Sequence, residues 1–373
     1  MKKSIIFFLS TVMMFLLSVQ AMGSPLESAV GELYNELPKD IENLLPDEVY
    51  ENIEKGDNLS AAESISAKFI IEKIISGISE ALKSFLTPLF SLIGTIVLAS
   101  LLYYVGTTIG GGGETALGFA GGLSVTVTTI GILTPLWKLM SDTLFGIGLL
   151  IKSALPTMTT IYAVSGNVSA AAVNSTWLTL LLTLLEELCQ TVISPLFYIC
   201  CGFLIVTSLS KYSGAPDMSG IVTSIKKLLI LLLGVIAVLF TSVMSYQTVV
   251  AKSADTMTLR SIKFASGNII PIIGGALGEA ADTFLSSVSV IRGTAGMITA
   301  VSLIIYSLPA VLKILVCKFC FTAASIVASV FGCKRETEIF NEASSILDIA
   351  LALVSICSVI FLIIIGIFAK NFA

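Results

Sequence analysis

Residues 260–293 are the part of this chain whose residue types and spacing could most directly support a chemical function. The segment contains Gly267, Asn268 and Pro271, followed by a second glycine cluster with two carboxylates three residues apart: Gly274, Gly275, Gly278, Glu279 and Asp282. These glycines permit a broken helix or a close backbone approach, as at transporter substrate sites and re-entrant pore loops. The alternative is an interfacial amphipathic hairpin whose charges lie in water. The sequence leaves both interpretations open, and these eight residues form the candidate functional segment.

Several ionisable residues lie within or beside strongly apolar segments of the chain: Lys152, Glu186, Glu187, Lys313 and Asp348. Charged side chains are costly in lipid and often mark functional sites. Here they are few and scattered. Lys313 and Lys318 can extend to an interface, and Asp348 lies near the start of a span, where a helix N-terminus favours a carboxylate. We therefore expect structural roles for these residues and no proton relay.

The chain contains no histidine and shows no catalytic constellation. The absence of histidine excludes His-based acid–base catalysis and His-ligated metal sites. No G-x-x-x-x-G-K-[ST] nucleotide-binding motif is present. Of the seven cysteines, Cys317 and Cys320 form a lone C-x-x-C, which is weak evidence for a metal, and small buried hydrophobes are the expectation. We expect a protein that is not an enzyme, with no catalytic residues, no cofactor and no metal. A net charge of -4 argues against a nucleic-acid partner.

Apolar residues dominate the chain, which indicates that most of it lies in a membrane. Hydrophobic residues make up 55% of the 373 residues and charged residues only 12%, which is more apolar surface than a soluble domain can hide. The apolar runs are continuous, which favours helices over a barrel. We predict an all-α, polytopic helical integral membrane protein with about six to nine spans, each needing roughly 20 residues. The clearest candidate spans are 84–105, 115–137, 190–209, 228–249, 294–316 and 346–369, and weaker ones are 143–163, 170–186 and 319–333.

The N-terminal part of the chain has the features of an exported segment. Lys2 and Lys3 precede a short apolar run that ends in small residues near Ala21, as in a secretory signal peptide. An uncleaved signal anchor is the alternative. The following residues are strongly acidic and carry apolar residues at helical spacing, which is typical of a solvated cap or of a docking arm for a partner.

These features divide the chain into five parts. We predict a signal peptide at 1–21, an acidic extracytoplasmic amphipathic helical arm at 22–83, an N-terminal membrane helix bundle at 84–249, a Gly-rich extracytoplasmic or re-entrant segment at 250–293 and C-terminal membrane helices at 294–373. An exported arm places the turn at 106–114 in the cytoplasm. The positive-inside rule places residues 210–227 in the cytoplasm as well, because they contain Lys211, Lys226 and Lys227. The sequence does not decide on which side of the membrane the C-terminus lies.

The segment from Lys263 to Thr283 resembles the stage III sporulation protein AE family of endospore-forming bacteria. The residues that carry the resemblance are Lys263-Phe264-Ala265-Ser266-Gly267-Asn268-Ile269-Ile270-Pro271 and Gly274-Gly275-Ala276-Leu277-Gly278-Glu279-Ala280-Ala281-Asp282-Thr283. The layout of signal peptide, acidic arm and many spans matches along nearly the whole chain. The resemblance implies a membrane component of the channel-like apparatus between mother cell and forespore. It also implies partners: the other proteins of the stage III sporulation A operon, including its ATPase and ring-forming subunits, and the forespore protein Q.

The expected function is therefore a membrane subunit of a specialised export or feeding channel, located in the mother-cell membrane around the forespore and required after engulfment. A separate ATPase would be consistent with the missing nucleotide motif. The alternative is a secondary transporter or permease with a discontinuous-helix substrate site at 260–293. Membrane lipid is a partner in either case.

Overall fold

The computed structural model is an elongated bundle of long helices, and no strand occurs in the residues that it describes. These are residues 47–54, 67–164, 168–213, 220–221, 223–236, 238–239, 242 and 274–369. The prediction of an all-α membrane protein is confirmed. Within the described residues, four helices are long and apolar enough to cross a membrane: Lys68–Ile109, Gly112–Pro156, Ile298–Val330 and Lys334–Leu362. Two shorter apolar helices, Ser175–Leu185 and Thr191–Phe203, accompany them.

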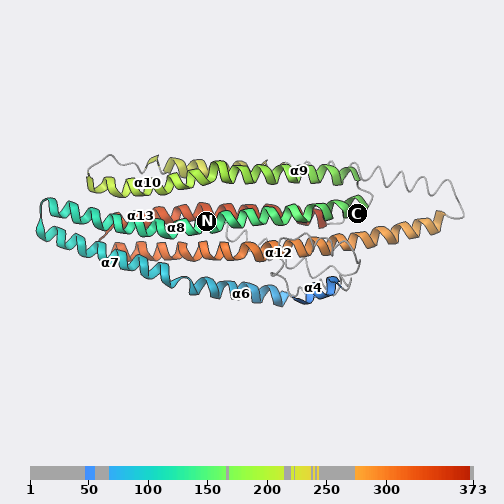
Figure 1. Cartoon of the computed structure of the whole chain (residues 1–373), viewed down its shortest axis with the longest axis horizontal. Coiled ribbons are helices and arrows are strands. Elements are labelled where there is room, and N and C mark those ends of the chain that lie inside the picture. The colour runs from blue at the N-terminus through green and yellow to red at the C-terminus, as the bar shows by residue number, and fades with distance from the viewer. Residues whose placement is uncertain are drawn as a thin grey trace.

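The helices run nearly parallel or antiparallel and form layers (Figure 1). One outer layer holds α9 (Val168–Glu187) and α10 (Ser194–Ser213), joined by the π-helix η1 (Leu188–Ile193). The middle of the bundle holds α8 (Gly112–Val164), α12 (Gly274–Val330) and α13 (Lys334–Ala369). The opposite side holds α7 (Leu86–Ile109), α6 (Ala67–Lys83) and the short α4 (Asp47–Glu54). Pro195, the second residue after η1, has no amide proton for the carbonyl of Thr191, which explains the wider turn.

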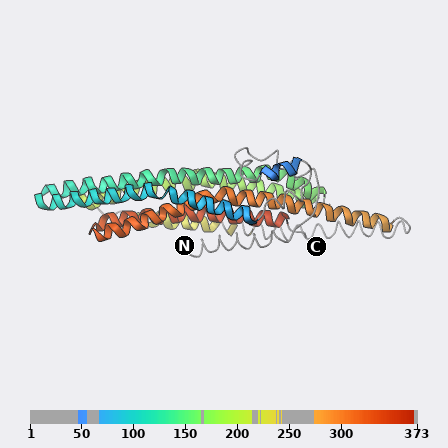
Figure 2. The ribbon, with the colours of Figure 1, turned by 90° about the horizontal axis from the view of Figure 1, so that it is seen from below.

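Two tight turns lie at the same end of the bundle (Figure 2). Gly110 and Gly111, with φ of 72° and 59°, join α7 to α8, so the turn expected at 106–114 is formed by these two residues alone. Gly332, with φ of 74°, joins α12 to α13. There the Cys333 amide donates to the Ala328 carbonyl at 2.9 Å and the Gly332 amide to the Ser329 carbonyl at 3.1 Å. This is a Schellman cap, which requires the left-handed conformation that glycine adopts without strain.

Some of the predicted spans are joined into single helices. Residues 115–137 and 143–163 both lie on α8, and residues 294–316 and 319–333 both fall largely on α12. The pairs are therefore not separate crossings divided by turns. Pro156 does not interrupt α8, because a proline can be accommodated in a long packed helix at the cost of one backbone hydrogen bond. Residues 1–46 and 55–66, which include the predicted signal peptide and more than half of the predicted arm at 22–83, lie outside the described residues.

The apolar core is concentrated on α12 and α13, which pack against each other more extensively than any other pair of helices. Of the most apolar window of α13, 78% is buried inside the protein, compared with 22% for the window of the α6–α7 span. The α13 core includes Phe340, Leu353 and Phe361. The most apolar part of α13 is therefore covered by other helices of this chain.

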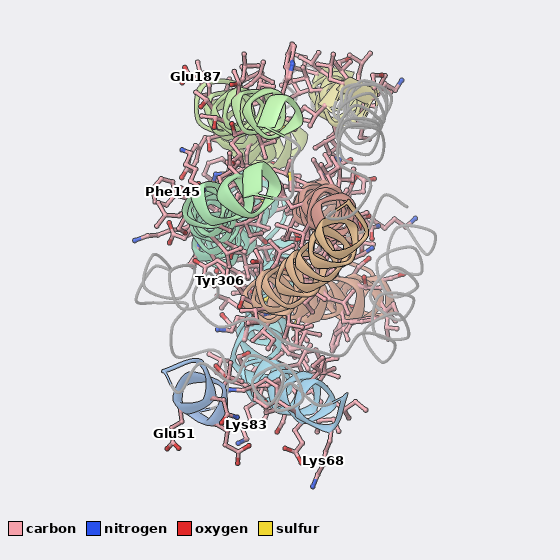
Figure 3. The ribbon with its side chains drawn as sticks, turned by 90° about the vertical axis from the view of Figure 1, so that its right-hand side faces the viewer. Glu51, Lys68, Lys83, Phe145, Glu187 and Tyr306 are labelled. Atoms are coloured by element: carbon pink, nitrogen blue, oxygen red, sulfur yellow. The ribbon has the colours of Figure 1, made fainter. Side chains whose placement is uncertain are left out.

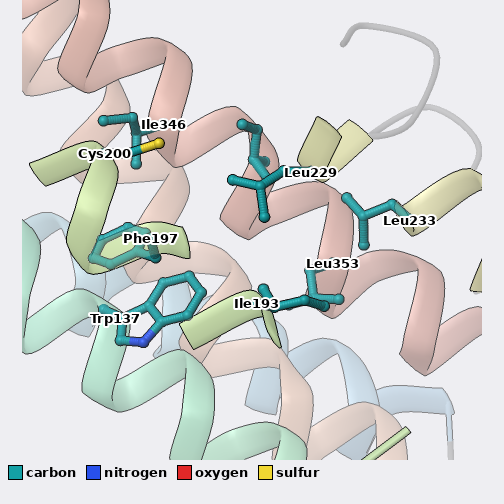
Figure 4. Close-up of a pocket in the computed structure, with 9 residues that line it drawn as sticks. Trp137, Ile193, Phe197, Cys200, Leu229, Leu233, Ile346 and Leu353 are labelled. Atoms are coloured by element: carbon teal, nitrogen blue, oxygen red, sulfur yellow. The ribbon is translucent and has the colours of Figure 1, made fainter. Parts of the chain in front are cut away.

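Two close contacts fix the position of α8 within the bundle. Gly146 lies against Tyr306 of α12, where a Cβ atom would come within 2.0 Å of the Tyr306 Oη (Figure 3). Trp137 stacks on Phe197 of α10, with ring centroids 3.8 Å apart, and its Nε1 donates to Ser194 Oγ at 3.3 Å. Figure 4 shows this stack beside apolar side chains of residues 223–236 and of α13, including Leu229 and Ile346. The helices are thus held in one register along the long axis.

Candidate functional site

The first half of α13 carries a row of polar residues on one helical face. We define the α13 polar stripe as the following residues: Arg335, Glu338, Asn341, Glu342, Ser345 and Asp348. Spacings of three and four residues place them on a common face of the helix. Arg335, Glu338 and Asn341 are exposed, and the other three are partly buried. The stripe interrupts a helix that is otherwise among the most buried of the bundle.

Polar groups from neighbouring helices hold three positions of the α13 polar stripe. Lys226 pairs with Glu342, and its own side chain is only 11% exposed. Further along, Lys318 of α12 donates to Asp348, with the two side chains 13% and 29% exposed. Next to the first of these pairs, Ser325 Oγ donates to Asn341 Oδ1 at 2.8 Å. Each of these three positions of the stripe therefore has a polar or charged partner on a neighbouring helix.

The α13 polar stripe lies at the same depth as the charge-free helix α7. Cys320 Sγ of α12 is 3.6 Å from the Phe85 carbonyl, and Ala99 of α7 lines the same pocket as Gly332, which follows the end of α12. Helices α7 and α12 therefore run in the same direction, and Phe90 is level with Ser325, the residue bonded to Asn341. Residues 84–113 contain no charged residue. A charged face of α13 and an uncharged face of α7 thus share one level of the molecule.

A pocket of about 310 Å³ lies where the two turns meet the bundle. Its walls come from the end of α7, the start of α8 and the α12–α13 turn, and the charged lining residues are Glu114, Lys334, Arg335 and Glu336. Glu336 is buried in the first turn of α13, where the helix N-terminus favours a carboxylate. Burial and the nearby Glu336 raise the pKa of the Cys333 thiol, which a Ser100 hydrogen bond lowers in part. The thiol is therefore neutral and buried.

The ionisable residues singled out from sequence lie in several environments. Asp348 belongs to the stripe and pairs with Lys318, and Lys313 lies 3.9 Å from Glu80 of α6. These pairs support the structural roles expected for both residues. Glu187 accepts from Thr191 at 2.8 Å and is exposed, as is Lys152, while the side chain of Glu186 lies outside the described atoms.

The candidate segment 260–293 is only partly described. Gly267, Asn268 and Pro271 lie outside the described residues. The backbone of Gly274, Gly275, Gly278, Glu279 and Asp282 forms the first turns of α12. Figure 1 shows this end of α12 extending past α8 and α13. The described residues from 274 onward form an uninterrupted helix.

Sequence reasoning missed most of the α13 polar stripe because it began the last span at residue 346. The helix begins twelve residues earlier, at Lys334. A usable signal was present, since the charged and amide side chains between 335 and 348 recur at helical spacing. The six cysteines whose side chains the structure describes are buried and free, and Cys317 and Cys320 lie one turn apart on α12.

Comparisons with known proteins agree on one family. The sequence model of the stage III sporulation protein AE family matches residues 48–371. A curated relative, stage III sporulation protein AE of Bacillus subtilis (strain 168), is 27% identical over 183 residues, which cover 49% of this chain and 45% of that relative. The alignment thus spans less than half of the relative's length. No solved structure matches the chain significantly.

Proposed function

This chain belongs to the stage III sporulation protein AE family, and from that premise we propose that it is a membrane subunit of the channel or export apparatus between mother cell and forespore. In this role the protein is required for spore formation after engulfment. The observation that carries the proposal is the family match, which extends from residue 48 to residue 371 and so includes every long helix.

The arrangement of polar residues supports a role in passage or assembly. Four helices are long and apolar enough to span a bilayer, yet α13 presents charged and amide side chains at the level of charge-free α7. Ionisable residues in membrane segments commonly face the bundle interior or a water-filled cavity. A helix that only anchors a protein in lipid would not carry such a stripe, because each charge in the membrane is costly.

The proposed partners are the other proteins of the stage III sporulation A operon, including its ATPase and ring-forming subunits, and through them the forespore protein Q. The proposed location is the mother-cell membrane that surrounds the forespore. An ATPase on a separate chain would supply energy. The acidic arm, on the outer side in our topology, would meet the ring-forming subunits.

Deleting the gene in the source organism tests this proposal. We expect unchanged vegetative growth and spores that arrest after engulfment, with recovery when the wild-type gene is restored. Microscopy with a membrane dye separates engulfed from unengulfed forespores. Normal spore yield in the deletion strain, together with slow vegetative growth, would refute the sporulation role and favour a housekeeping transporter.

A further inference from the structure

The pocket where the two turns meet the bundle, which we call the turn pocket, carries opposite charges on two of its walls. Glu114 lies in the first turn of α8, and Lys334 is the first residue of α13. Both residues are exposed, and neither forms an ion pair in the part of the chain that the structure describes. The volume of about 310 Å³ falls in the range of small-molecule sites, roughly 300–1,000 Å³. The turn pocket thus keeps a carboxylate and an ammonium group apart, with room for a ligand between them.

The position of Lys334 is electrostatically unfavourable for the helix that carries it. The start of a helix already concentrates positive charge, because its first backbone N–H groups have no partner within the helix. Arg335 and Glu336, the other charged residues of α13 in the turn pocket, already have interaction partners. A phosphate bound at this point would accept from the Lys334 ammonium and would also be favoured by the helix start. The arrangement therefore suits an anionic group on the α13 side of the turn pocket.

The turn pocket lies at the level of a membrane–water interface when α7 spans the bilayer. Residues 84–113 contain no charged residue. From Lys83 to Tyr103 there are about 20 residues, or roughly 30 Å of helix, which is the thickness of the hydrocarbon core. Tyr103 lines the turn pocket, and both Tyr103 and Tyr104 are exposed, as is typical of aromatic residues at the interface. The charged residues of the turn pocket therefore lie at the depth of lipid head groups.

We propose that the turn pocket binds the phosphoethanolamine head group of a zwitterionic phospholipid. The inference rests on the membrane location in the proposed function and adds a ligand to it. The phosphate lies at Lys334 and the start of α13, and the primary ammonium donates to the Glu114 carboxylate. A head group with both charges satisfies both walls, whereas a purely anionic head group leaves Glu114 beside a like charge. The acyl chains run along exposed apolar side chains of α7, such as Leu98 and Leu101.

Lipid retention by the purified full chain tests the proposal. The protein in a mild detergent is mixed in turn with phosphatidylethanolamine, phosphatidylglycerol and phosphatidylcholine that carry the same acyl chains, and native mass spectrometry measures the bound lipid. We expect an apparent affinity about tenfold higher for phosphatidylethanolamine, because hydrogen bonds between charged groups are the strong ones. Phosphatidylglycerol lacks the ammonium group, and the quaternary ammonium of phosphatidylcholine has no proton to donate.

Two neutral variants separate the two ends of the head group. Lys334→Gln should weaken the retention of phosphatidylethanolamine and phosphatidylglycerol alike, by about tenfold, because both lipids carry the phosphate. Glu114→Gln should weaken the retention of phosphatidylethanolamine alone, so that its advantage over phosphatidylglycerol disappears. Lys68→Gln and Glu72→Gln are the controls, since this exposed pair lies on α6, and they should leave retention unchanged.

Three results would overturn the proposal. Equal retention of the three lipids by the wild type would do so without any variant having to fold. Wild-type retention in both pocket variants, with wild-type melting temperatures, would place the lipid elsewhere. Displacement of the lipid by free phosphoethanolamine at similar concentration would show that the turn pocket takes a soluble phosphate compound and not a lipid. The sporulation phenotype of the deletion strain does not depend on lipid retention, so the two proposals fail separately.

Discussion

Helices α7 and α13 are both apolar enough to span a membrane, but they use their apolar residues in opposite ways. Of the most apolar window of the α6–α7 span, 22% is buried inside the protein, and for α13 the value is 78%. The exposed side chains of α7 are uncharged and mostly aliphatic or aromatic, whereas those of the first half of α13 are charged or amide-bearing. Hydropathy alone makes the two helices equivalent. Their surroundings differ: α7 leaves apolar side chains on the outside of the bundle, where lipid suits them, and α13 forms the core of the bundle.

The contrast also explains where the charges lie. A helix surrounded by lipid must exclude them, because each exposed charge near the bilayer centre is costly. A helix packed among protein neighbours can carry charges wherever a neighbour supplies the opposite sign, as Lys318 does for Asp348. The charged residues of α13 therefore indicate that polar neighbours pack against it, and the lack of charge on α7 indicates that lipid surrounds its outer face.

The largest expected effect comes from placing a carboxylate on each face at one depth. Phe90→Asp should destabilise the inserted protein by about 2.5–3.5 kcal/mol, the cost of a charge at the centre of a lipid-facing helix. Asn341→Asp should cost only about 0.5 kcal/mol, from like-charge neighbours on its own helix. The yield of folded protein in the membrane measures both. Equal losses in yield would remove the distinction between the faces.

Breaking the Lys318–Asp348 pair should give the next largest effect. Asp348→Ala leaves a mostly buried ammonium without its carboxylate and should cost about 2 kcal/mol, less than a fully buried pair. Thermal unfolding in detergent measures the loss. Lys68→Ala is the control, since the Lys68–Glu72 pair of α6 is 85% and 64% exposed and points away from the bundle (Figure 3). Its removal should cost less than about 0.5 kcal/mol. The pair is unimportant if both variants unfold like the wild type.

The contact between α8 and α12 gives a smaller effect with a close control. Gly146→Ala places a methyl group inside the Tyr306 ring position and should cost about 1–2 kcal/mol through overpacking. Gly148→Ala, two residues away, meets nothing within 4 Å and should be neutral or stabilising. Melting temperatures of the two variants in the same detergent test the register of the bundle. A lower melting temperature for Gly148→Ala than for Gly146→Ala would show that the register is wrong.

The smallest effect concerns the turn that orients the α13 polar stripe. Gly332→Ala forces a Cβ atom into the left-handed region and should cost about 1 kcal/mol. Gly131→Ala, inside α8 and with nothing within 4 Å, is the matched control and should be slightly stabilising. The difference between their unfolding midpoints isolates the backbone strain. An unchanged unfolding midpoint for Gly332→Ala would mean that the Schellman cap is not needed to stabilise the turn between α12 and α13.

The sequence predicted the helical class well and the positions of helix ends less well. The predicted span 84–105 corresponds closely to α7, because its apolar run is bounded by polar residues and glycines. The predicted division of α8 near residue 140 is absent, because Lys138 and Asp142 are exposed on a helix whose other faces stay buried. A hydropathy average combines all faces of a helix, so it cannot distinguish one long helix with an exposed polar face from two shorter spans.

The candidate site was harder to predict because it depends on neighbours that are distant in the chain. Asp348 was singled out, but its partner Lys318 is thirty residues away and was interpreted as extending to an interface. Glu342 pairs with Lys226, which lies more than a hundred residues earlier in the chain. Only the fold reveals that these residues share a depth with Phe90. The glycine segment 260–293, which sequence singled out first, stays a prediction.

The most direct test of the central claim is to place a spin label at Phe90 and at Glu338 in turn in the membrane-embedded protein. Accessibility to oxygen, which concentrates in lipid, is then compared with accessibility to a water-soluble nickel chelate. A lipid-facing α7 and a polar, water-facing α13 predict that oxygen dominates at Phe90 and the nickel chelate at Glu338. Oxygen dominating at both positions would place the α13 polar stripe against lipid and contradict the account.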